Sequence, residues 1–92
     1  MGIIVVQHEI KDPEKFFSLT EEVLGNAPEG ARALQFCPNQ DHSRATCLWE
    51  ANRLDGLRTY LDQYSSGVAE NTYFEVDEQN AFGLPEQSPA RA

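Results

Sequence analysis

The chain opens with four consecutive β-branched residues, Ile3-Ile4-Val5-Val6, followed by alternating polar and apolar positions up to Glu9. Such a run predicts a strand over 2–9 that is buried on both faces. Asp12-Pro13-Glu14 then marks a helix start, because aspartate caps the first turn, proline fits the first helical position and glutamate suits the positive end of the helix dipole. This helix ends before Pro28, and its apolar side follows helical spacing through Phe16, Phe17, Thr20, Val23 and Leu24.

Two further strands are predicted over 31–37 and 44–50, and the polar linker between them is short enough for a hairpin. A second helix opens at Asn52 or Arg53 and ends at Ser65-Ser66-Gly67. Residues 71–76 alternate as a fourth strand. The second helix carries a single apolar stripe, formed by Leu54, Leu57, Tyr60, Leu61 and Tyr64.

The resulting order, strand-helix-strand-strand-helix-strand, predicts a ferredoxin-like α+β fold. In this fold a four-stranded antiparallel sheet carries both helices on one face. We expect one such domain over 1–78, because 92 residues leave little room for a second core. Residues 79–92 are predicted to form a C-terminal extension, which either crosses to a partner subunit as an exchanged strand or stays mobile.

The register of the hairpin predicts what each face of the sheet carries. If the hairpin is centred on His42, Phe36 lies opposite Leu48 and Cys37 lies opposite Cys47. The helices are then expected to cover the more apolar set: Leu34, Phe36, Leu48, Phe74 and Val76. The uncovered face would combine apolar and hydrogen-bonding side chains: Ile4, Val6, His8, Gln35, Cys37, Cys47, Trp49, Asn71, Tyr73 and Glu75. Because such a face is too apolar to leave in water, we expect a homodimer that pairs two sheets and encloses a cavity.

The net charge of the chain mainly excludes certain classes of binding partner. Acidic residues outnumber basic ones by 15 to 7, which gives a formal net charge of −8. We therefore expect no nucleic-acid partner, since nucleic acids are bound by basic surfaces, and no binding to an anionic membrane. The longest apolar stretch, Ile3 to Val6, is far shorter than the roughly 20 residues of a spanning helix, and no signal peptide is expected. Two cysteines are too few for a disulfide scaffold, so a cytoplasmic location is expected.

The chain resembles the dimeric α/β-barrel superfamily, whose members pair ferredoxin-like chains sheet to sheet. Three features carry the resemblance over about residues 3–76: the element order, Val5-Val6-Gln7-His8 with Asp12-Pro13-Glu14 after it, and Cys47-Leu48-Trp49-Glu50-Ala51 before the second helix. The superfamily includes cofactor-independent monooxygenases of antibiotic biosynthesis, haem-degrading enzymes, muconolactone isomerases, dye-type peroxidases and small nickel-binding proteins. Membership implies a fold and a cavity but not a reaction. In the nickel-binding relatives a histidine ligand lies on the second strand, where this chain has Gln35, and this departure weakens the case for nickel.

His8 is the first candidate for chemistry, because an imidazole on a cavity-facing strand titrates close to neutral pH and can serve as a general base. The alternative is a strand-end histidine that is solvated or bonded to a neighbouring carbonyl. Trp49 and Tyr73 would stack on a planar ligand and hydrogen-bond to it, or would be aromatic side chains of the dimer interface. Gln35 would orient the substrate, and Glu75 would offer it a carboxylate.

Cys37 and Cys47, if opposite each other, would form a disulfide, share a soft metal ion with His8 or His42, or remain two buried thiols. The chain has no glycine-rich phosphate loop and no H-E-x-x-H, C-x-x-C or G-x-S-x-G motif, so we expect no cofactor. The leading hypothesis is a homodimer that binds an aromatic or polyketide-like compound in its cavity, as a cofactor-independent monooxygenase or isomerase. The alternatives are a metal-binding protein of the nickel type and a non-catalytic dimeric domain.

Overall fold

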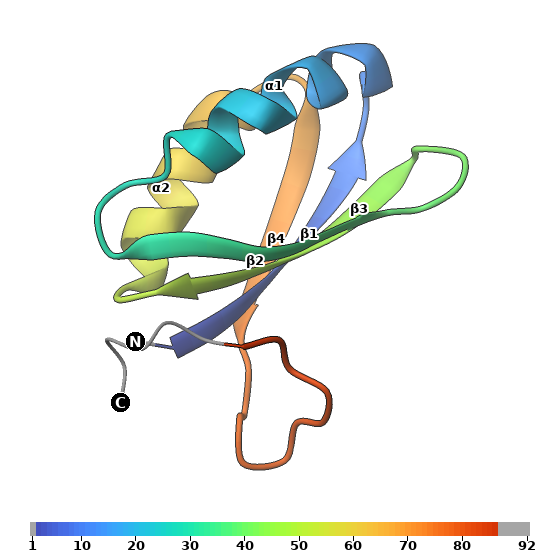
Figure 1. Cartoon of the computed structure of the whole chain (residues 1–92). Helices are drawn as coiled ribbons and strands as arrows, with labels where there is room; N and C mark the ends of the chain where they lie inside the picture. The colour runs from blue at the N-terminus through green and yellow to red at the C-terminus, as the bar shows by residue number, and fades with distance from the viewer. Residues whose placement is uncertain (1, 87–92) are drawn as a thin grey trace.

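The protein, in a computed structural model that describes residues 2–86, contains four strands and two helices. In chain order the elements are β1 (Gly2–Ile10), α1 (Pro13–Gly25), β2 (Ala31–Pro38), β3 (Arg44–Ala51), α2 (Leu54–Ser65) and β4 (Ala69–Glu75). The strands form one antiparallel sheet in the order β2-β3-β1-β4, with both helices on one side of it (Figure 1). The predicted ferredoxin-like α+β fold is therefore confirmed.

The ends of α1 follow the local signals of the sequence. Asp12 Oδ1 accepts a hydrogen bond from the backbone N–H of Lys15 at 3.1 Å, and Pro13 occupies the first turn, as predicted. The connection to β2 depends on Gly30, whose φ of +85° lies in the left-handed region that favours glycine. A β-carbon at this position would also overlap the side-chain amide of Asn52, so the turn requires glycine on both grounds.

The core lies between the helices and one face of the sheet, here called the covered face. Its largest members, Trp49 and Ile4, are almost completely buried, and Leu57 and Leu61 of α2 pack against them. A second cluster at the other end of the sheet joins Phe16 of α1 to three smaller residues: Ile10, Ala45 and Val68. Burial of these apolar side chains makes the main contribution to the stability of the helices packed on the sheet.

The predicted hairpin register is wrong. Next to the loop, Gln35 pairs with Leu48 and Phe36 pairs with Cys47, each one residue away from the predicted partner. The register shifts again between Ala33 and Gln35, where Leu34 is the extra residue, as in a β-bulge. A shift of one residue exchanges the faces of a strand relative to its neighbour. Phe36 therefore lies on the same face as Cys47, whereas the prediction placed it with Leu48.

The predicted faces of β1, β3 and β4 are also wrong. Ile4, Val6 and His8 pair with Trp49, Cys47 and Ala45, and all of these lie on the covered face rather than on the uncovered one. The same pairing places Asn71, Tyr73 and Glu75 on the covered side and Phe74 on the other. β1 is apolar on both faces, so the sequence pattern could not decide which face the helices choose.

The opposite face of the sheet, here called the open face, is not uniformly bare. Ile3 and Glu50 lie on it and are each 1% exposed. At this end the chain after β4 loops away from the sheet and returns toward the start of β1 (Figure 1). Val76 N–H donates to the carbonyl of Ile3 at 2.8 Å, and Arg32 Nη2 donates to the carbonyl of Glu86 at 3.4 Å. The returning segment is thus bonded to β1 and β2 at this end of the sheet.

The rest of the open face is partly exposed. Val5 and Leu48 are half-buried, and about half of Phe74 is exposed. No helix among residues 2–86 is both long and apolar enough to cross a membrane. Residues 87–92 of the predicted C-terminal extension lie outside the described residues.

Candidate functional site

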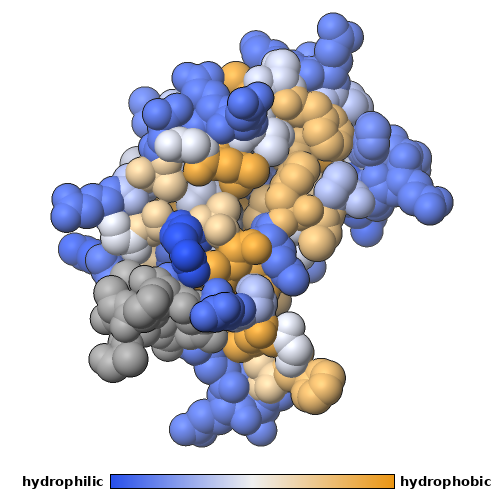
Figure 2. Space-filling model, viewed as in Figure 1, coloured by the Kyte–Doolittle hydropathy of each residue, from blue (hydrophilic) through white to orange (hydrophobic). Residues whose placement is uncertain are grey.

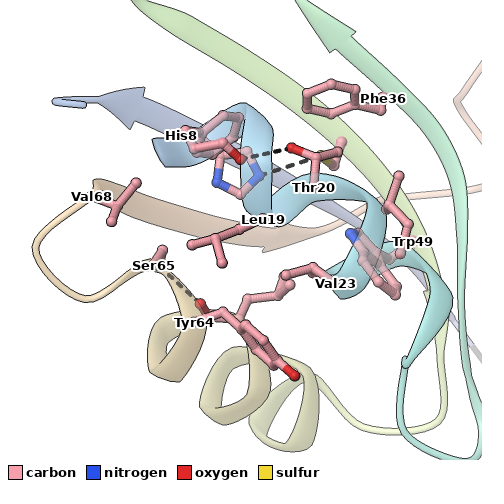
Figure 3. Close-up of a pocket in the computed structure, with 13 residues that line it drawn as sticks. His8, Leu19, Thr20, Val23, Phe36, Trp49, Tyr64, Ser65 and Val68 are labelled. Carbon is pink, nitrogen blue, oxygen red and sulfur yellow. Dashed lines mark hydrogen bonds between the residues drawn. The ribbon is translucent and has the colours of Figure 1, made fainter. Parts of the chain in front are cut away.

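A small cavity of about 50 Å³ lies between the covered face and the two helices. Its walls are mostly apolar and come from α1, α2 and the sheet, with Leu19, Val23 and Phe36 among them (Figure 3). Polar atoms reach it from His8, Cys47 and Trp49 on the strands and from Thr20 and Ser65 on the helices. The hydroxyls of Thr20 and Ser65 are already used, because they donate to the carbonyls of Phe16 and Leu61 at 2.9 and 2.8 Å.

His8 is held from both sides of its ring. Nδ1 lies 2.6 Å from Asn71 Oδ1. On the other side, Nε2 lies 3.3 Å from Cys47 Sγ (Figure 3). The ring of Phe16 meets it edge to face, with 5.3 Å between centroids. Burial lowers the pKa of His8 below its ordinary value, although the hydrogen bond to Asn71 and the charge of Asp62 act in the opposite direction. The ring is therefore neutral at neutral pH and able to accept a proton.

The tautomer of His8 follows from the contacts of Asn71. The Asn71 amide nitrogen lies 3.0 Å from Asp62 Oδ1 and 2.7 Å from Ser65 Oγ. A carboxylate oxygen only accepts hydrogen bonds, so the Asn71 NH₂ group must face Asp62 and its carbonyl oxygen must face His8. His8 Nδ1 accordingly carries the proton and donates it to Asn71. The lone pair of Nε2 is then directed at the thiol of Cys47, which donates to it.

The two cysteines do not lie opposite each other, contrary to the prediction. Cys37 pairs with Thr46 on the open face and is exposed, whereas Cys47 is buried on the covered face, and both are free thiols. Burial raises the pKa of the Cys47 thiol to about 12, with a smaller contribution from Cys37. Cys47 and His8 therefore rest as a neutral thiol and a neutral imidazole, not as an ion pair.

Trp49 carries an unsatisfied hydrogen-bond donor. In the part of the chain that the structure describes, its Nε1 is the one buried side-chain nitrogen or oxygen without a hydrogen-bond partner. Trp49 is 1% exposed and lines the cavity, and Figure 3 shows its indole nitrogen on the side of the ring that faces the cavity. A buried donor without a partner costs about 1–3 kcal/mol, so an acceptor that reaches this N–H would be stabilised.

The other predicted site residues are dispersed. Tyr73 is half-buried, and its hydroxyl donates to Asp62 Oδ1 at 2.5 Å, which together with burial raises its pKa. It therefore supports the Asn71 network without lining the cavity. Glu75 is exposed at the end of β4, and Gln35 lies on the open face. The structure thus brings together His8 and Trp49 of the predicted set but not Gln35 or Glu75.

The proposed metal-ligand group of His8, His42, Cys37 and Cys47 is not assembled. His42 lies in the β2–β3 loop against the ring of Phe17, with 4.6 Å between centroids, and Cys37 lies on the open face. Within residues 2–86, no group of three or more His, Cys, Asp or Glu side chains is placed to hold a metal ion. The sequence pattern placed Cys47 and Asn71 on one face with His8, but it predicted neither a hydrogen bond from Cys47 to His8 nor any contact of Asn71, because only the three-dimensional register shows these contacts.

No model of a known protein family matches the chain, and no curated protein sequence matches it. The similarity that the structure supports is therefore one of fold: a small α+β protein with ferredoxin-like topology.

Proposed function

We propose that this protein binds a small organic molecule in the cavity beneath its helices. The observation that carries the proposal is the buried Trp49 Nε1–H, which lines the cavity without a hydrogen-bond partner. An otherwise apolar cavity with one unused donor favours a ligand with an apolar body and one acceptor atom. His8 Nε2, at the same cavity, provides a base for a ligand that can lose a proton.

The size of the cavity limits the ligand class. An apolar cavity of about 150 Å³ is needed to hold benzene, whereas this one has a volume of about 50 Å³. We therefore favour a ligand of a few heavy atoms at this site. An aromatic or polyketide-like compound, as the superfamily resemblance implies, would need the larger space that two open faces enclose in a dimer.

We propose a second copy of this chain as the partner of the open face. Phe74 exposes about half of its surface there, next to half-buried Val5, which pairs with it and with Leu48. Phe82, in the loop after β4, is fully exposed as well, and Figure 2 shows apolar side chains beside polar ones on that loop. Exposed aromatic groups of this kind are typical of interfaces between subunits.

Sedimentation velocity tests the dimer. We expect the wild-type protein to sediment as a dimer and Phe74→Asp to sediment as a monomer with an unchanged circular dichroism spectrum. Thr59→Asp places the same charge at an exposed position of α2 and is the control. If the wild-type protein is a monomer at micromolar concentration, the proposed dimer is wrong, but the proposed ligand site is not affected.

We assign the protein to the reducing environment of the cytoplasm. Cys37 and Cys47 lie on opposite faces of the sheet and cannot form a disulfide within the chain. An exposed free thiol such as that of Cys37 persists most readily in a reducing compartment.

Tryptophan fluorescence tests the ligand site directly, because Trp49 is the one tryptophan of the chain. We expect acetone and acetamide to change its emission with a saturable dose dependence, and benzaldehyde, which is too large, to give no saturable change. Val23→Phe fills the cavity and should abolish the response, while Val5→Phe makes the same change on the open face and should retain it. A response that never saturates, or one equal in both variants, contradicts the proposal.

A further inference from the structure

The cavity wall holds a thiol and an imidazole, and a carboxamide outside the wall completes their chain of hydrogen bonds. Cys47 Sγ lies 3.3 Å from His8 Nε2, and His8 Nδ1 lies 2.6 Å from Asn71 Oδ1. This order of groups is the one that thiol proteases use: a nucleophile, the base that takes its proton, and an orienting amide. The three residues come from β3, β1 and β4, so the rigid centre of the sheet fixes their geometry.

The donor that such chemistry requires is present at the same cavity. Trp49 stands two residues from Cys47 on β3, on the same face, and its buried Nε1–H has no partner. A donor aimed at the oxygen of a carbonyl group stabilises the negative charge that develops when a nucleophile attacks the carbon. The unpaired N–H of Trp49 is therefore explained if it donates a hydrogen bond to the carbonyl oxygen of a bound ligand.

We infer that Cys47 adds covalently to a small aldehyde bound in the cavity, with His8 as base, Asn71 as positioning residue and Trp49 as oxyanion donor. This inference rests on the proposed ligand site and names its substrate class. A volume of about 50 Å³ is about a third of that of an apolar cavity of about 150 Å³ that holds benzene, so a compound much smaller than benzene is favoured, and acetaldehyde is among the smallest aldehydes. The apolar lining from Leu19, Val23 and Leu61 suits its methyl group.

The step balances without any co-reactant. The Cys47 thiol transfers its proton to His8 Nε2 as the sulfur forms a bond to the carbonyl carbon, and the C=O π bond breaks toward the oxygen held by Trp49. His8, now an imidazolium whose Nδ1–H is bonded to Asn71, returns the proton to that oxygen. The product is a neutral thiohemiacetal, and the reverse sequence releases the aldehyde.

The resting state of the pair agrees with a reversible reaction. Burial lowers the pKa of His8 and raises that of Cys47 to about 12, so the thiol stays protonated until an electrophile is bound beside the base. A thiol held in this state is protected from oxidation, because the thiolate is the reactive form. Cys37, exposed on the open face and away from the cavity, provides an internal reference.

Carbon-13 NMR with [1-13C]acetaldehyde tests the inference. We expect a new signal from a carbon bonded to sulfur and oxygen, distinct from free aldehyde and its hydrate, in the wild type and in Cys37→Ser. Cys47→Ala should lose the signal. His8→Gln should slow its appearance by about 100-fold or more, since general base catalysis contributes at least this much. Trp49→Phe, which keeps an aromatic wall but removes the donor, should weaken the adduct about tenfold, as expected for one lost hydrogen bond.

The outcomes separate this inference from the proposed function. If acetone saturates the Trp49 emission but wild-type protein gives no adduct with acetaldehyde, the ligand site stands and the covalent step is wrong. An adduct that persists in Cys47→Ala and disappears in Cys37→Ser also overturns it. The wild-type and Cys37→Ser spectra decide the question even if a cavity variant fails to fold.

Discussion

The two faces of the sheet use similar residues in opposite ways. On the covered face, Trp49 and Ile4 are almost fully buried beneath the helices, and on the open face their neighbours Leu48 and Val5 are only half-buried. Among the described residues, each face also buries one imidazole or carboxyl group, His8 on the covered side and Glu50 on the open side. The comparison shows how a single sheet separates a buried cavity from a partly exposed face.

The two buried groups are stabilised by different means. His8 is neutral and has a hydrogen-bond partner at each ring nitrogen, so it is compatible with an apolar cavity. Glu50 lies 3.8 Å from the guanidinium of Arg32, whose Nη2 also binds the returning segment after β4. The covered side therefore holds a neutral imidazole, while on the open side the arginine of the charged pair also binds the backbone of Glu86.

The largest expected difference between the two faces is in the loss of stability when neighbouring residues of β3 are truncated. Trp49→Ala removes a fully buried indole and should cost about 3–5 kcal/mol of the free energy of unfolding. Leu48→Ala, on the open face, should cost about 1 kcal/mol. Urea denaturation followed by circular dichroism measures both, because the first variant lacks tryptophan. Equal losses would remove the distinction between the two faces.

A smaller effect is expected from the hydrogen-bond network. Asn71→Ala leaves His8 Nδ1 without its acceptor and should reduce the free energy of unfolding by about 1–3 kcal/mol. Thr72→Ala is the control, because Thr72 is the next residue and is exposed on the open side, where such changes stay within about 0.5 kcal/mol. Urea denaturation followed by Trp49 fluorescence compares them. A neutral Asn71→Ala would show that the network does not support the fold.

The pH dependence of stability should report on His8. Its folded pKa is lowered and its unfolded pKa is about 6.5, so the unfolded chain binds more protons as the pH falls below that value. The free energy of unfolding should therefore decrease below about pH 6.5, by up to about 1.4 kcal/mol per pH unit, until the folded pKa is reached.

Histidine variants isolate this contribution. His8→Gln should flatten the slope of stability against pH between about 6.5 and 5, relative to wild type. His42→Gln, which alters the exposed histidine of the hairpin loop, should keep the wild-type slope. If both variants keep that slope, the burial of His8 does not cause the decrease in the free energy of unfolding at acid pH.

The smallest effect is expected for the exposed thiol. Cys37→Ser replaces an exposed side chain on the open face and should change the free energy of unfolding by less than about 0.5 kcal/mol. Thermal unfolding under reducing conditions measures it. A larger loss would mean that this part of the open face is covered in solution, as it would be in a dimer.

Local signals in the sequence predicted the elements well. Asp12 and Pro13 set the start of α1, and Ser65-Ser66-Gly67 sets the end of α2, because capping and chain reversal depend on neighbouring residues. The grouping of His8, Trp49 and Tyr73 on one face was also correct, since side chains alternate along each strand. Which face the helices cover was predicted wrongly.

The error comes from the register of the β2–β3 hairpin. Phe36 pairs with Cys47 instead of the predicted Leu48, so it lies on the side of Cys47 and Trp49 and makes that side of the sheet the more apolar one. Hydrophobic alternation does not fix the number of residues in the loop, and that number sets the register of a hairpin.

By itself, the amino-acid sequence determined the order of elements, the ends of the helices and the fold class, because these follow from local periodicity and turn chemistry. The tertiary structure alone decided which face of the sheet became the core and which side chains meet there. Cys47, His8 and Asn71 come from three strands and are up to 63 residues apart in the chain. Only the hydrogen-bonded register of the sheet brings these three residues together, and it places His8 and Cys47 at one cavity with the unused N–H of Trp49.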